Sequence, residues 1–256
     1  LDAAEPPGGL AGASAHASTL AFELTSGRRP VIVNCGSGAP FGEDWHRASR
    51  ATQSHSTLTI DGYSSSRFAH DGRDVLEDRA RLPLLHMQVD GSGPPHVLAA
   101  QDGWRASHGL LHLRDLTLSE DGRHLAGVDV LRAETPADRT RLEAVLRHAG
   151  GALGFALRFH LHPDADARLD MGGNAVSIAL RSGEIWVFRH SGGAKLTLDP
   201  SVYLEKGRLM PRATKQILLT TDLRDFEGRI GWTLAKAQDT PLAIRDLDRD
   251  DPPSRP

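Results

Sequence analysis

The amino-acid sequence predicts an all-β fold, a large two-sheet antiparallel β-sandwich, and three observations lead to this prediction. Short segments rich in β-branched residues recur along the chain, each bounded by Gly, Ser, Asn or Asp. Turn pairs such as Asp61-Gly62 and Asp121-Gly122 return often, about every ten to twenty residues, which is typical of antiparallel sheets. The alternation of strands and helices that Rossmann-like and barrel enzymes require is missing.

Residues 110–118 give the clearest strand pattern. They alternate leucine with His112, Arg114 and Thr117, the period of two that a half-buried strand shows. The other expected strands are residues 19–25, 30–34, 57–61, 176–180, 184–188 and 216–220.

Pro136–His148 is the one segment in which we expect a helix, although its residues 143–146 could equally form an edge strand. Trp104 and Trp186 are expected to pack in the core or at a sheet edge.

The composition excludes several classes of protein. The chain has 256 residues, 39% of them hydrophobic and 25% charged, which suits a globular protein with a sizeable core. Its 30 basic and 33 acidic residues give a net charge of −3, which excludes a broadly basic nucleic-acid binder. No apolar run approaches the roughly 20 residues of a membrane helix, so no membrane partner is expected. A single cysteine, Cys35, excludes an intrachain disulfide.

The ends of the chain differ in composition from its middle. The chain begins at Leu1 and continues through a segment rich in Pro and Gly, so we interpret residues 1–14 as the remnant of a linker and the chain as a fragment. Residues 15–245 are expected to form one domain. Residues 246–256 lack apolar side chains and are expected to be a disordered tail.

Three polar residues stand at the ends of neighbouring expected strands. His16 precedes the first strand, Asn34 ends the second and His55 opens the third. Two imidazoles and one oxygen would leave a fourth position open on zinc, and an Asn ligates only through its neutral amide oxygen, more weakly than Asp. The alternative is that the three groups are hydrogen-bonded locally and bind no metal.

Four motifs resemble segments of the C-terminal domain of heparinase II/III-like proteins, and they occur in the same order as in that family. They are residues 15–38 (AHASTLAFELTSGRRPVIVNCGSG), residues 44–62 (DWHRASRATQSHSTLTIDG), Asp102-Gly103-Trp104 with the HLR of residues 112–114, and residues 158–163 (RFHLHP). Together they span most of residues 1–221.

The resemblance implies a sandwich that follows an N-terminal helical toroid, a domain that this chain lacks, in a polysaccharide lyase. Such a protein would act on uronic-acid-containing polysaccharides by β-elimination, in the periplasm, with zinc on His16, Asn34 and His55. Two of the family's catalytic positions differ here: Ser14 stands where a His is expected, and residues 35–54 contain no Tyr. We therefore assign no catalytic residue and expect the fragment alone to be inactive.

Residues that could contact an acidic polysaccharide lie between Asn34 and His55. They are Trp45, His46, Arg47 and Arg50. The two arginines could pair with a substrate carboxylate in a bidentate manner, and the alternative is a solvated loop.

For His160, His162 and Cys35 we expect structural roles. His160 and His162 share a strand face and are expected to be structural, and Cys35 has no recognisable base in the sequence. Two functions remain open, the sandwich part of a lyase and a non-catalytic carbohydrate-binding or scaffolding module.

Overall fold

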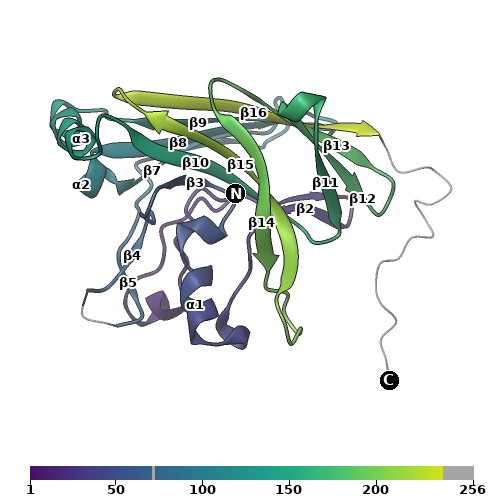
Figure 1. The fold of residues 1–256 in the computed structure, drawn as a ribbon, viewed down its shortest axis with the longest axis horizontal. Coiled ribbons are helices and arrows are strands. Elements are labelled where there is room, and N and C mark those ends of the chain that lie inside the picture. The colour runs from purple at the N-terminus through teal and green to yellow at the C-terminus, as the bar shows by residue number, and fades with distance from the viewer. Residues whose placement is uncertain (71–72, 239–256) are drawn as a thin grey trace.

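Two antiparallel sheets form a sandwich in the computed structural model, which describes residues 1–70 and 73–238 (Figure 1). Strands account for 47% of the residues and helices for 16%, which confirms the predicted all-β sandwich. In spatial order, the eight-stranded sheet contains β11 (Ala165–Asp170), β12 (Ala175–Leu180), β13 (Ile185–Ser191), β16 (Glu227–Gln238), β9 (His124–Arg132), β8 (Leu110–Leu118), β7 (His96–Trp104) and β6 (Leu84–Gln88).

The six-stranded sheet carries the N-terminal strands. Its order is β1 (Leu24–Ser26), β2 (Arg29–Val33), β10 (Leu153–Leu161), β15 (Arg212–Leu223) and β14 (Lys195–Tyr203), and β3 (Leu58–Ile60) also pairs with β10. The expected strand over residues 19–25 is wrong for most of its length. Leu20 has a φ of 67° and the Ala21 N–H donates to Ser18 O, so the chain turns there and pairs only from Leu24.

Several short elements lie outside the two large sheets. The hairpin of β4 (Arg67–Phe68) and β5 (Leu76–Asp78) and the helix α1 (Glu43–Ser49) extend from the sandwich, whereas α2 (Arg105–His108) and α3 (Pro136–His148) cover one end of it (Figure 1). Four 3₁₀ turns complete the described part: η1 (Gly9–Ser14), η2 (Ala39–Phe41), η3 (Thr52–Ser54) and η4 (Met171–Gly173).

The helix predicted over Pro136–His148 is confirmed with the same bounds, and the alternative of an edge strand is wrong. Thr135 and Asp138 form a capping box, and Pro136 occupies the first turn, where its missing N–H costs nothing. The sequence analysis missed α1 and α2 because helices of seven and four residues are too short to show a period.

Aromatic rings join the two sheets across the core. Phe159 of β10 lies 4.9 Å from the rings of both Phe188 and Trp232, which belong to the other sheet. Phe22 stacks on Trp232 at 5.5 Å. A Cβ at Gly127, which is opposite Trp232 in the ladder, would overlap the indole, so glycine is needed there. Trp104 and Trp186 are both fully buried.

A buried polar network lies beside this aromatic cluster. Arg114 of β8 and Asp129 of β9 form an ion pair of 2.7 Å with both side chains fully buried. The second Asp129 oxygen accepts from Trp232 Nε1 at 2.9 Å, and His112 Nε2 lies 2.7 Å from the first oxygen. Burial would raise the pKa of Asp129, but the Arg114 charge and the His112 hydrogen bond outweigh it and hold the pKa at about 2.

The N-terminal residues lie against the domain. The Asp2 N–H donates to Ala21 O at 2.7 Å, and Arg79 donates to Pro6 O at 2.9 Å. The segment expected to be a linker remnant, residues 1–14, therefore makes specific contacts with the sandwich. Residues 239–245 of the expected domain and the expected tail, residues 246–256, lie outside the described residues. Within residues 1–70 and 73–238, none of the helices has the length and apolar character to cross a membrane.

Candidate functional site

The structure brings together two of the three predicted zinc ligands. His16 follows η1, His55 follows η3, and His16 Nδ1 lies 3.0 Å from His55 Nε2. The rings meet edge to face with centroids 5.2 Å apart. The Nδ1 of His55 lies 2.8 Å from Ala51 O, to which it can only donate, so in the neutral ring the Nε2 lone pair faces His16.

Burial keeps both imidazoles neutral. Desolvation lowers the pKa of His55 to about 3, and the neighbouring His16 adds to the shift. Desolvation also lowers the pKa of His16, assisted by the positive charge of Arg50. Both rings are therefore neutral at neutral pH, with His16 Nδ1 donating to His55 Nε2; His16 would have to take its other tautomer for both facing nitrogens to offer a lone pair to a metal.

Asn34 is hydrogen-bonded to other groups. Its Nδ2 and its backbone N–H both donate to Glu23 Oε1, at 3.1 and 3.0 Å, and its Oδ1 accepts the Ser56 N–H at 2.9 Å. These bonds fix the end of β2 to the segment that carries His55. Within the described residues, no group of three or more His, Cys, Asp or Glu side chains is placed to hold a metal ion.

Arg50 is a fully buried structural residue. Its Nε donates to Ala15 O at 2.8 Å, its Nη2 donates to Gly12 O at 2.8 Å, and its Nη1 pairs with Asp74 at 2.8 Å. A guanidinium with these partners and no exposed surface is poorly placed to meet a substrate carboxylate. The substrate contact that the sequence analysis assigns to Arg50 does not fit this geometry.

The other three predicted substrate residues lie on α1 and reach the surface. Trp45 is 36% exposed, and the side chains of His46 and Arg47 are 22% and 56% exposed. The Arg47 guanidinium lies 4.1 Å from the centre of the Phe68 ring on β4. A Cβ at Gly38 would overlap the backbone of Trp45, so this glycine lets the preceding loop approach α1 closely.

Asp74, which the sequence analysis did not single out, lies close to three basic residues at and just after α1. Its carboxylate lies 3.4 Å from His46, 3.7 Å from Arg47 and 2.8 Å from Arg50. The residue lies between β4 and β5, so only the folding of that hairpin over α1 creates these contacts. No spacing in the sequence indicates them.

The sequence analysis also missed a base next to Cys35. His160 Nδ1 lies 3.5 Å from Cys35 Sγ and 2.7 Å from Ser201 Oγ, while its Nε2 lies 2.9 Å from Gln53 O. Burial raises the pKa of the Cys35 thiol to about 11 and lowers that of His160 to about 4. The thiol stays protonated, so the pair is structural and Cys35 is not an activated nucleophile.

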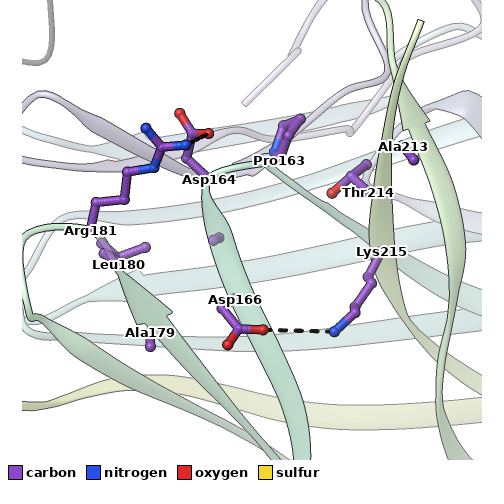
Figure 2. Close-up of a pocket in the computed structure, with 10 residues that line it drawn as sticks. Pro163, Asp164, Asp166, Ala179, Leu180, Arg181, Ala213, Thr214 and Lys215 are labelled. Atoms are coloured by element: carbon purple, nitrogen blue, oxygen red, sulfur yellow. Dashed lines mark ion pairs between the residues drawn. The ribbon is translucent and has the colours of Figure 1, made fainter.

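A separate hollow of about 580 Å³ lies where β11 and β12 approach β15, far in sequence from the histidine pair (Figure 2). Its charged side chains pair with each other, Arg181 with Asp164 at 2.9 Å and Lys215 with Asp166 at 3.8 Å. These charges offset one another, and the hollow contains none of the predicted site residues.

Comparisons with known proteins agree with the motifs. The family described as heparinase II/III-like, C-terminal, matches residues 1–233. FtsZ-localized protein C of Caulobacter vibrioides is 31% identical over 249 residues, which cover 93% of this chain and 40% of that protein.

Two solved structures share the fold. Heparan sulfate lyase HepC from Pedobacter heparinus has a TM-score of 0.65 at 14% identity, with 92% of this chain and 32% of that chain covered. A heparinase III has a TM-score of 0.62 at 14% identity, and the match covers 88% of this chain and 30% of that one. The chain thus spans less than half the length of the curated relative and about a third of these structures.

The histidine pair predicts an acid-sensitive fold. Because the pKa of His55 is lower in the folded chain than its ordinary 6.5, the unfolded chain binds the proton more readily between pH 6.5 and about 3. The free energy of unfolding should therefore fall as the pH falls through this window. His55→Gln keeps a hydrogen-bonding side chain that cannot titrate, so the slope should become shallower by up to about 1.4 kcal/mol per pH unit.

Urea unfolding at a series of pH values measures this slope, with His124→Gln at the exposed start of β9 as the control. Identical slopes for wild type and His55→Gln would show that the pair does not couple protonation to folding.

Proposed function

This chain belongs to the heparinase II/III-like C-terminal family, and from that premise we propose that it is a non-catalytic module that binds acidic polysaccharide within a longer protein. One observation supports the proposal above others. His16, His55 and Asn34 are hydrogen-bonded within the chain and Arg50 is fully buried, whereas Trp45 and Arg47 lie on one short helix with 36% and 56% of their surface exposed, although Arg47 also lies 3.7 Å from Asp74.

The chemistry of α1 suits an acidic sugar. A guanidinium can form two parallel hydrogen bonds with a uronate carboxylate, and Phe68 already holds that of Arg47 from one side. An indole can cover the apolar face of a sugar ring while its N–H hydrogen-bonds at the edge. Trp45 and Arg47 would thus contact the ring and the carboxylate.

β-Elimination of a uronic-acid polysaccharide is the second candidate, as an activity of the longer protein. It requires a neutralised carboxylate, a general base and a general acid. Family membership and a fold shared with a heparan sulfate lyase favour it. Against it, Ser14 cannot act as a base unaided, no Tyr lies in residues 35–54, and the curated relative is named for its localisation with FtsZ. The base and the acid would have to come from a preceding helical domain.

Zinc at the histidine pair is a separate proposal. His16 Nδ1 and His55 Nε2 are 3.0 Å apart, slightly closer than the roughly 3.3 Å between two nitrogens bound tetrahedrally to one zinc ion. The two rings would have to separate slightly for both nitrogens to ligate the ion, and Asn34 would be the weakest ligand because its oxygen already accepts from Ser56. When bound, zinc would fix the N-terminal segment to the loop before β3.

Arg47→Ala is expected to weaken the binding of uronate oligosaccharides about tenfold, the equivalent of one lost charge-assisted contact. Trp45→Ala should also weaken it. Isothermal calorimetry measures the affinity, with Arg168→Ala on β11 as a matched exposed arginine that should change nothing. Equal affinities for wild type and Arg47→Ala would refute binding at α1.

A second measurement on the same samples separates binding from catalysis. The absorbance of the unsaturated product of β-elimination should stay constant, and an increase would show turnover by this chain and favour the lyase function instead.

Asn34→Asp is expected to tighten zinc binding, because an anionic oxygen attracts a divalent cation far more strongly than an amide dipole does. The gain should be roughly ten- to hundredfold in affinity. His55→Ala should abolish binding, since two remaining ligands cannot hold the ion against water. Zinc titration by calorimetry compares the three proteins after circular dichroism has shown that each is folded. Negligible heat in all of them would leave the three residues as local hydrogen-bonding groups.

A further inference from the structure

An apolar edge strand ends the eight-stranded sheet. β6 pairs with β7 on one side, and within the described residues no strand pairs with its other side. Leu84, Leu85 and Met87 of β6 are 37%, 45% and 52% exposed, and Val89 just beyond it is 63% exposed. Because successive side chains of a strand point to opposite faces, Leu85 and Met87, followed by Val89, make one face of β6 apolar, while Leu84, His86 and Gln88 lie on the other face.

The other end strands of the two large sheets, β11, β14 and β1, carry features that prevent edge-to-edge pairing. β11, at the opposite edge of the same sheet, and β14, at one edge of the six-stranded sheet, bear charged residues or proline, and β1 is only three residues long. The protecting residues are Asp166, Arg168 and Asp170 on β11, and Lys195, Asp199 and Pro200 on β14. β6, with the sequence LLHMQ, has no acidic residue, lysine, arginine or proline. An unprotected edge of this kind is a template for another strand.

We propose that β6 pairs antiparallel with β6 of a second copy of this chain, centred on His86, so that two eight-stranded sheets become continuous. The strand is complementary to itself in this arrangement. Leu84 lies opposite Gln88 and Leu85 opposite Met87, so each pair joins a neutral residue to a neutral residue. The exposed leucines and Met87 become partly buried, and the free backbone groups of the edge are paired.

The charges at the ends of β6 favour the same partner. The nearest formal charges are Arg81 before the strand and Asp90 after it, and both residues are exposed. Antiparallel pairing brings Arg81 of each copy towards Asp90 of the other, so opposite charges approach at both ends, whereas parallel pairing would bring like charges together. Pro83, which has no N–H to donate, limits the new ladder to the length of β6. A contact this short suits a weak, concentration-dependent dimer.

Sedimentation velocity on the 256-residue chain, from roughly 1 µM to 1 mM, tests the pairing. The mass of the wild-type chain should rise from 27.6 kDa towards twice that value with concentration. Met87→Lys puts a charge in the centre of the contact and should weaken association at least tenfold. Leu169→Lys makes a matched change at a residue that is 50% exposed on the opposite edge strand, and it should leave association unchanged. A chain that stays at 27.6 kDa throughout, or equal effects of the two variants, would overturn the proposal.

A cross-linking experiment tests the register. His86→Cys places two cysteines opposite each other across the two copies, within reach of a disulfide. Mild oxidation should give a covalent dimer on a non-reducing gel, while Leu169→Cys should remain a monomer. The native Cys35 is buried and does not compete. No covalent dimer with His86→Cys would rule out the antiparallel pairing centred on this residue.

Discussion

The buried ion pair of Arg114 and Asp129 is the constraint on which the rest of the structure depends. Arg114 not only bonds to Asp129 but also donates from Nη1 to Leu20 O and Ser56 O, at 2.6 and 2.9 Å. One side chain of the eight-stranded sheet therefore holds both N-terminal segments that run beside the other sheet. Because Ser56 follows His55 and also donates to Asn34, the candidate site inherits its position from this pair. Removing one member of a buried ion pair leaves the other charge buried without its partner, which is strongly destabilising.

This constraint separates structural residues from those available for binding. The polar residues near the N-terminus that stand out in the sequence are hydrogen-bonded within the chain. The exposed candidates for binding lie on α1, where Phe68 and Asp74 of the β4–β5 hairpin contact Arg47. This chain shares its fold with a heparan sulfate lyase and is 31% identical over 249 residues to a protein named FtsZ-localized protein C, so the fold by itself assigns no function. Function in this family has to be argued from the residues of each chain.

Local sequence patterns predict the parts of the fold that local forces determine. The leucine alternation of β8 and the capping box of α3 both depend on neighbours in the sequence, and both predictions are confirmed. The burial of Arg50, the His160 ring beside Cys35 and the contacts of Asp74 with Arg47 and Arg50 depend on segments that only folding brings together. His112 and Arg114 were visible as part of a motif, but their buried partner Asp129 gave no signal, because a lone aspartate in a strand is usually exposed.

The measurement that tests this dependence most directly is the free energy of unfolding, by urea denaturation, of Arg114→Leu compared with Arg168→Leu. Both changes remove an arginine from an ion pair with an aspartate, one fully buried and one exposed on β11. We expect Arg114→Leu to lose about 3–5 kcal/mol because it leaves the Asp129 charge buried without its cation, and Arg168→Leu to lose less than about 1 kcal/mol. Replacing both residues, in Arg114→Leu with Asp129→Leu, should recover part of the loss. Small and equal losses in the two single variants would show that the sandwich holds its N-terminal segments without this pair.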